Sequence, residues 1–71
     1  MDFVSSQLKS VRVSNGLSQN EVAAALRISR QSVSKWENGR TYPDIDNLIL
    51  LSDLYETSVD NLVKSHEELQ Q

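Results

Sequence analysis

Signals that begin or end an α-helix recur at short intervals along this chain, and they leave room only for short helices. Asn15-Gly16 is typical of a helix end, because both residue types tolerate the left-handed backbone conformation. Ser18 and Glu21 have the spacing of a capping box, in which each side chain satisfies a free backbone N–H. Further signals of these kinds are Ser29, Gly39, Pro43, Asp44 and Ser58. Strand-like alternation is nearly absent, so we predict an all-α fold.

Apolar residues between these signals have the spacing of amphipathic helices. Val4, Leu8 and Val11 lie at i, i+4 and i+7, which predicts one buried face of a first helix. The five predicted helices span residues 3–14, 18–26, 30–38, 45–55 and 58–63. A chain of 71 residues has room for a single core, so residues 1–64 are predicted to form one domain followed by a polar tail at 65–71.

Composition excludes several classes of site. The chain has no cysteine, which excludes disulfides and thiolate metal sites. Its single histidine, His66, lies in the polar tail and is interpreted as a solvated residue. No ligand cluster, phosphate loop, signal peptide or membrane-length apolar segment is present. We therefore expect a soluble, cytoplasmic protein that is not an enzyme, with no cofactor, no metal and no membrane partner.

Charge is distributed unevenly along the sequence. The formal net charge is −3, which is unusual for a protein that binds a polyanion. Residues 1–26 are neutral, residues 27–41 carry +3 and residues 42–71 carry −6. Such a polarised molecule would turn its short basic segment toward nucleic acid and its acidic part away.

The predicted third helix has a polar face without a carboxylate. If Val33 and Trp36 are buried, the opposite face carries Gln31, Ser34, Lys35 and Asn38, with Arg30 at its N-terminal edge. Side chains of these types hydrogen-bond base edges in the DNA major groove, which has the width of an α-helix. A solvated helix face without function is the alternative interpretation of this pattern.

The run SRQSVSKWENG at residues 29–39 is specific enough to suggest a family. Further segments with a familiar pattern are Leu8-x-x-Val11-Arg12, residues 16–23, Tyr42-Pro43, Leu48, Leu51, Leu54, Ser58 and Leu62. In these segments together the chain resembles the Cro/phage-repressor (XRE) family of helix-turn-helix regulators over residues 4–63. The resemblance implies a compact five-helix, lambda-repressor-like DNA-binding domain, with the helix-turn-helix formed by helices two and three.

The resemblance also implies roles for individual residues. The implied base-contacting residues are Arg30, Gln31, Ser34 and Lys35. The implied phosphate-contacting residues are Gln19, Ser29, Ser32, Asn38, Arg40 and Thr41. Arg12 and Glu37 are expected to form an ion pair inside the fold, the alternative being that Arg12 clamps a phosphate. Trp36 is expected in the core rather than stacked on a base.

Three positions depart from the family pattern. Arg27 stands in the inter-helix turn where the family often has glycine, and a non-glycine residue with positive φ costs on the order of 1 kcal/mol. Glu56 replaces another common glycine, and Thr57 stands where a small apolar residue is usual. We expect these substitutions to alter local backbone details and to leave the fold unchanged.

The resulting hypothesis is a transcriptional regulator, expected to be a repressor, that binds a near-palindromic operator in double-stranded DNA as a homodimer. The dimer surface is expected in helices four and five, with Tyr55, Val59 and Val63 partly exposed. Two alternatives stay open. The chain is a protein-docking module whose acidic half binds a basic partner, or an antitoxin that binds both DNA and a toxin. An anti-repressor is a further conceivable protein partner.

Overall fold

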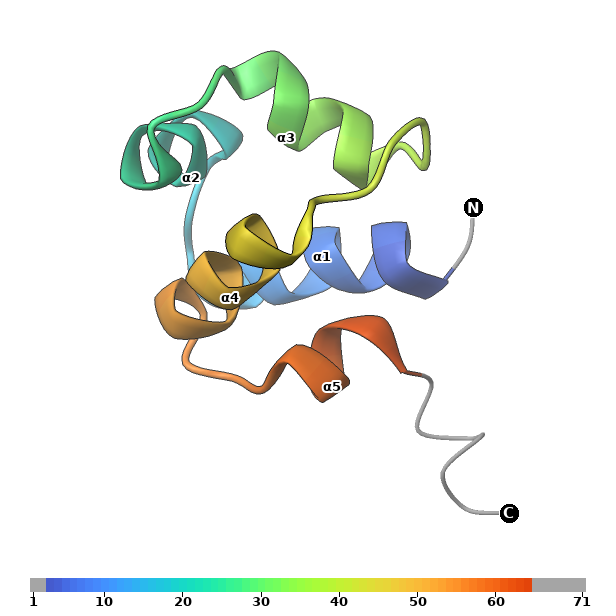
Figure 1. The fold of residues 1–71 in the computed structure, drawn as a ribbon. Helices are drawn as coiled ribbons and strands as arrows, with labels where there is room; N and C mark the ends of the chain where they lie inside the picture. Colours follow the sequence, from blue (N-terminus) through green and yellow to red (C-terminus); the bar gives the residue numbers. More distant parts are fainter. Residues whose placement is uncertain (1–2, 65–71) are drawn as a thin grey trace, which may run out of the picture.

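A computed structural model of the chain describes residues 3–64 and contains five helices and no strand within that range. The helices are α1 (Phe3–Ser14), α2 (Gln19–Leu26), α3 (Arg30–Glu37), α4 (Ile45–Leu54) and α5 (Val59–Val63). In Figure 1, α2 and α3 lie above α1 and α4, and α5 lies at the bottom of the bundle. The predicted all-α fold is confirmed, while the predicted polar tail and His66 lie outside the described residues.

Four helices begin at a side chain that caps the backbone, which explains why their starts were predictable. Ser18 accepts a hydrogen bond from the Glu21 N–H, and the Glu21 carboxylate accepts one from the Ser18 N–H, completing a capping box. The N-caps of α3, α4 and α5 are Ser29, Asp44 and Ser58. Each one satisfies a backbone N–H that has no partner within the helix.

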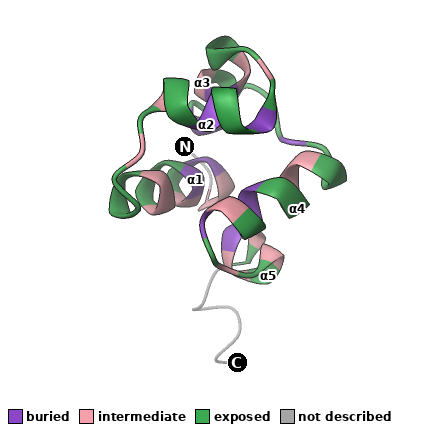
Figure 2. Cartoon of the chain, turned by 90° about the vertical axis from the view of Figure 1, so that its left-hand side faces the viewer, coloured by how far each residue is buried: buried purple, intermediate pink, exposed green. Residues whose placement is uncertain are grey.

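One apolar core joins all five helices. Its fully enclosed side chains include Leu8 of α1, Val22 of α2, Val33 of α3, Leu51 of α4 and Leu62 of α5. Ala23, Leu26, Trp36 and Tyr55 complete the buried cluster. Figure 2 shows these buried segments turned toward the centre of the bundle, with the exposed surface along the outer sides of the helices. Trp36 is therefore a core residue, as expected.

The expectation for the outer surface of the last two helices was partly wrong. Tyr55 is only 4% exposed, because α4 ends at Leu54 and the next residue turns into the core as the C-cap. Val59 and Val63 are half-buried. The exposed apolar residues of this region are Ile45, Ile49 and Leu50 of α4, together with Tyr42 just before it.

Two non-glycine residues have left-handed backbone conformations. Arg27, the C-cap of α2, has φ 58°, and Glu56, after α4, has φ 53°. These are the two positions at which the resemblance noted above implies glycine. The left-handed turns are therefore kept with side chains present, at a cost in backbone strain. The same structure contains no helix, within its described range, that is long and apolar enough to cross a membrane.

Candidate nucleic-acid interface

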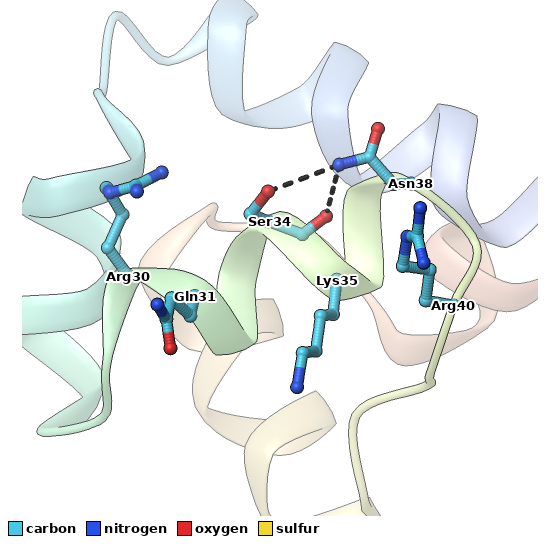
Figure 3. A pocket seen from close by; sticks show the side chains of 6 residues that line it. All are labelled: Arg30, Gln31, Ser34, Lys35, Asn38 and Arg40. Carbon is cyan, nitrogen blue, oxygen red and sulfur yellow. Dashed lines mark hydrogen bonds between the residues drawn. The ribbon is translucent and has the colours of Figure 1, made fainter.

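The outward side of α3 and the loop after it form a polar surface, here called the recognition face. It surrounds an open hollow of about 350 Å³ lined by Arg30, Gln31, Ser34, Lys35, Asn38 and Arg40. Figure 3 shows Gln31 and Lys35 projecting from the same side of α3, with Arg30 at one end and Arg40 at the other. All four implied base-contacting residues line this hollow, together with two of the implied phosphate-contacting residues.

The solvent-exposed charge of residues 27–41 is more positive than their formal net charge of +3. Arg27, Arg30, Lys35 and Arg40 are all exposed. Among the described residues 27–41, Glu37 is the only carboxylate, and its exposed fraction is 3%. The acidic group of the segment is therefore buried, and only the four cations are exposed to solvent. Such a surface attracts a polyanion.

Glu37 forms an ion pair with Arg12, and the pair ties α1 to the end of α3. Arg12 Nε donates to Glu37 Oε2 at 2.7 Å, and Arg12 Nη2 donates to Glu37 Oε1 at 3.0 Å. Arg12 Nη1 donates to the Leu17 carbonyl at 2.8 Å, so the guanidinium also holds the loop before α2. The hydrogen bond to Glu37 raises the pKa of Arg12. Arg12 is thus engaged within the fold, away from the recognition face.

Gln19 belongs to the same polar network, which was not predicted from the sequence. Its Nε2 donates to Glu37 Oε1 at 3.0 Å, and its Oε1 accepts a hydrogen bond from Arg30 Nη1 at 3.3 Å. The network therefore runs from the buried ion pair to the first residue of the recognition helix. Its members lie far apart in the sequence, and only the packing of α1, α2 and α3 brings them together.

The other implied phosphate-contacting residues lie around the two ends of α3. Ser29 caps the helix by accepting from the Ser32 N–H, and the hydroxyls of Ser29 and Ser32 lie 3.1 Å apart. Asn38 Nδ2 donates to the Ser34 carbonyl at 2.8 Å and to the Ser34 hydroxyl at 3.2 Å, as Figure 3 shows. Thr41 is exposed in the loop that follows and does not line the hollow.

Other kinds of site find no support in the described part of the chain. No group of His, Cys, Asp and Glu side chains there could hold a metal ion. Tyr55 is the titratable side chain with the clearest perturbation, because burial and then the charge of Glu37 raise its pKa to about 12. Tyr55 is buried in the core, so this shift reflects the core and gives no indication of an active site.

Comparison with known families shows the class of protein to which this chain belongs. The model of the helix-turn-helix family HTH_3 matches residues 8–62, which include all of α2 and α3. The chain belongs to this helix-turn-helix family. The resemblance to the XRE regulators is thereby confirmed, and α2, the turn at Arg27 and α3 are its helix-turn-helix. The family is a class of DNA-binding regulators and not of enzymes.

Individual relatives agree with this assignment. The chain is 33% identical over 67 residues to the transcriptional activator BcrR of Enterococcus faecalis, covering 94% of this chain and 32% of the relative. It is 41% identical over 58 residues to the prophage-derived regulator YonR of Bacillus subtilis, covering 82% of this chain and 54% of YonR. It is 38% identical over 61 residues to the regulator ImmR of the same organism, covering 86% and 48%.

A solved structure has the same fold. The crystal structure of a transcriptional regulator from Listeria innocua superimposes with a TM-score of 0.79 at 26% identity, covering 94% of this chain and 69% of that one. The five-helix arrangement is therefore that of a transcriptional regulator. The chain spans between about a third and about a half of the length of the curated relatives.

Proposed function

We propose that this helix-turn-helix protein binds double-stranded DNA sequence-specifically, with α3 in the major groove. The observation that carries the proposal is the recognition face, on which donor and acceptor side chains are exposed while the only carboxylate of the segment is buried. The pairing of Glu37 with Arg12 on the inner side of α3 leaves the outer side of the helix without an acidic group. An exposed carboxylate on this helix would repel phosphates.

Within this proposal, the recognition face divides into base and phosphate contacts. Arg30, Gln31, Ser34 and Lys35 contact bases, since their side chains project from the α3 face that lines the hollow. Contacts to phosphates come from Gln19, Ser29, Ser32, Asn38, Arg40 and Thr41. Phosphate contacts set the position of the protein on the duplex, and base contacts determine the preferred sequence.

The active species is proposed to be a homodimer on a near-palindromic operator. One domain contacts too few base pairs to find a unique site in a genome. A two-fold dimer places its recognition helices about 34 Å apart, in successive major grooves. We place the dimer surface on α4 and α5, because Ile45, Ile49 and Leu50 expose apolar surface there.

Sedimentation with and without DNA tests the dimer. The variant Ile49→Ser removes exposed apolar area without disturbing the core and should shift the protein toward the monomer. Val13→Ser is the matched control, because Val13 is 58% exposed on α1, outside the proposed surface. A wild-type protein that stays monomeric at high concentration, both free and on DNA, would defeat the dimer while leaving DNA binding in place.

We infer that binding represses transcription, by occupying an operator that overlaps a promoter and excluding RNA polymerase. The relative from Enterococcus faecalis is named an activator, so the position of the operator is the deciding observation. An operator upstream of the promoter, with increased transcript levels on binding, would replace repression by activation.

Selection of binding sites from random duplex DNA at near-physiological salt tests the main proposal. We expect a two-fold symmetric motif whose half-sites carry base preferences that change in the variants Gln31→Ala and Lys35→Ala. Recovery of no motif by a folded protein would reject DNA recognition in favour of a protein-docking function for this domain.

A further inference from the structure

The hydroxyl of Ser34, on the recognition face, accepts a hydrogen bond from the residue one turn later. Asn38 Nδ2 donates to the Ser34 carbonyl at 2.8 Å and to the Ser34 hydroxyl oxygen at 3.2 Å (Figure 3). An amide NH₂ group is a donor only, so the serine oxygen is the acceptor in this contact. The hydroxyl hydrogen of Ser34 therefore points away from Asn38.

The Ser34 carbonyl determines the orientation of the Asn38 amide. Turned over, the amide would direct its oxygen at this carbonyl oxygen, and two acceptors repel each other. The carbonyl also accepts from the Asn38 backbone N–H at 3.0 Å, so it is held as part of the C-terminal end of α3. Asn38 thus presents a fixed donor to the Ser34 hydroxyl.

A second serine shows how a hydroxyl within a helix can use its hydrogen internally. Ser52 of α4 is buried, and its hydroxyl donates to the Ile49 carbonyl at 2.7 Å. Within residues 3–64, by contrast, no acceptor is hydrogen-bonded to the Ser34 O–H. Ser34 is half-buried and lines the hollow on the recognition face. Its hydroxyl hydrogen is therefore available to a ligand that enters this hollow.

A ligand acceptor satisfies this hydroxyl better than a ligand donor. The hydrogen bond from Asn38 polarises the Ser34 O–H group and strengthens it as a donor. A ligand donor would instead use the remaining lone pair and leave the O–H without a partner once the duplex excludes water, which is costly. Serine in general pairs with either donors or acceptors on base edges. The contact with Asn38 removes that ambiguity.

The purine atom N7 fits such a donor. N7 is the major-groove acceptor that adenine and guanine share, whereas cytosine presents a donor there. Of the major-groove acceptors, N7 lies closest to the sugar-phosphate backbone, at the outer edge of the base. Ser34 is shorter than its neighbours Gln31 and Lys35 and is half-buried, so it reaches this outer edge before any deeper atom.

We propose that Ser34 selects a purine in each half-site by donating its hydroxyl hydrogen to N7, and that Asn38 is the positioning residue that keeps this hydroxyl a donor. The inference rests on the proposed binding of α3 in the major groove and adds the class of base and the atom that Ser34 contacts. A phosphate contact of Asn38 acts on all sequences alike, so it is separable from this role.

Affinities for two matched duplexes test the role of Ser34. Binding-site selection with the wild type and with Ser34→Ala first identifies the base pair whose preference depends on Ser34. One duplex then carries the selected site, and the other carries the 7-deaza analogue of the purine in that pair, which has a C–H group in place of N7. The wild type should bind the first duplex about 2- to 12-fold more tightly, the range of one net hydrogen bond. Ser34→Ala should bind both equally.

Two variants of Asn38 test the positioning role. Asn38→Asp keeps the shape and replaces the donor by an acceptor, so the Ser34 O–H should turn to the new carboxylate and the N7 preference should be lost. Asn38→Ala removes the donor without adding charge and should reduce the preference. Asn20→Asp is the matched control for charge, because Asn20 is exposed on α2 and does not line the hollow. It should change the affinity for both duplexes by the same factor.

Three results would overturn the inference, and they differ in what else they reject. A selected motif that Ser34→Ala leaves unchanged, or equal affinities of the wild type for the two duplexes, would reject the contact with N7 and leave DNA recognition by α3 in place. If both folded Asn38 variants, checked by helix content and melting temperature, keep the wild-type preference, Asn38 does not position Ser34. If the wild type selects no motif at all, the proposed function and this inference fail together.

Discussion

The two halves of this domain use their polar residues for opposite purposes. In the recognition half, formed by α2, α3 and the loop to Thr41, the cations are exposed, and of the two carboxylates Glu37 is buried against Arg12 while Glu21 is exposed in the capping box of α2. In the supporting half, residues 42–64, the carboxylates themselves are exposed. These are Asp44, Asp46, Asp53, Glu56 and Asp60. The net charge of −3 is a sum over surfaces of opposite sign. It therefore does not indicate the charge of the partner that either surface would bind.

Packing differs between the halves as much as charge does. The recognition half is stabilised by a polar network as well as by Val22, Val33 and Trp36 of the core. The supporting half relies on capping residues and on Leu51, Tyr55 and Leu62. Substitutions in this polar network are therefore expected to change both stability and specificity, those of exposed side chains on the recognition face specificity alone, and those in the core of the supporting half stability alone.

The largest expected effect is the loss of stability when the buried ion pair is broken, compared with the loss when a surface ion pair is broken. Glu37→Gln leaves Arg12 charged and unpaired in a mostly buried place, and it should lower the free energy of unfolding by about 3 kcal/mol in urea denaturation. Lys64→Ala removes the surface pair with Asp60, whose N···O distance is 3.8 Å, and should change stability by less than about 0.5 kcal/mol. Equal losses in the two variants would show that burial does not distinguish these pairs.

The next effect concerns DNA and should be confined to the recognition half. Gln31→Ala and Lys35→Ala should each cost about 1–3 kcal/mol of binding free energy at one base position, with the unfolding free energy unchanged. Asp53→Ala, an exposed substitution in the supporting half, is the matched control and should leave all base preferences intact. Titrations against the selected site and its single-base variants measure both quantities. A change of base preference in Asp53→Ala would show that base preference also depends on residues outside the recognition half.

Alkaline pH should destabilise the fold through Tyr55, a core residue of the supporting half. Burial, followed by the negative charge of Glu37, raises the pKa of Tyr55 from its ordinary value near 10 to about 12. The folded state therefore holds the phenolic proton more tightly, so this stability is fully present below pH 10 and is lost as the pH rises toward 12. We expect a loss on the order of 1 kcal/mol over the first unit of that range.

The variant Tyr55→Phe serves as the reference for that titration, since it keeps the ring and has no proton to lose. Its stability should fall less than that of the wild type over the same pH interval. Ultraviolet absorbance of the phenolate monitors ionisation, and melting temperature monitors stability. A wild type and a phenylalanine variant with the same pH dependence would contradict the assignment to Tyr55.

The smallest expected effect is the change in stability when the side chain is removed from either of the two strained turns. Arg27→Gly and Glu56→Gly each remove a side chain from a left-handed backbone, and each should stabilise the fold by about 0.5 kcal/mol once the greater freedom of glycine in the unfolded chain is deducted. DNA binding should separate them. Arg27→Gly removes a cation from the recognition half and should weaken binding on all sequences at low salt, whereas Glu56→Gly should not. Thermal denaturation and salt-dependent affinities check both expectations.

Features that depend on neighbouring residues in the sequence could be predicted well. Ser18, Ser29, Asp44 and Ser58 each cap a helix, because a cap needs only the side chain and the next few backbone N–H groups. The left-handed conformation at Arg27 also agrees with the glycine usual there in the family. These caps placed the starts of four helices, and the first helix was placed by the spacing of its apolar residues and by Asn15-Gly16 at its end.

Features that depend on contacts between distant segments could not be predicted in the same way. The burial of Tyr55 follows from the end of α4 at Leu54, one residue earlier than the spacing of apolar residues suggested. The contact of Gln19 with Glu37 and Arg30 needs the relative placement of α2 and α3. The contacts of the candidate site with DNA stay predictions, since residue type alone does not specify which base each side chain meets.

The separation of the hollow-lining residues from the core has a consequence for how such a protein diversifies. Gln31 and Lys35 contribute nothing to the buried cluster, so each can be exchanged without disturbing the core, and under the proposed binding mode such single exchanges would give copies of this domain new target sites. Arg30 is different, because it donates a hydrogen bond to Gln19, which itself donates to the buried carboxylate of Glu37. A replacement at position 30 therefore also changes the surroundings of a buried ion pair, so this end of the recognition face is less free to vary than its middle.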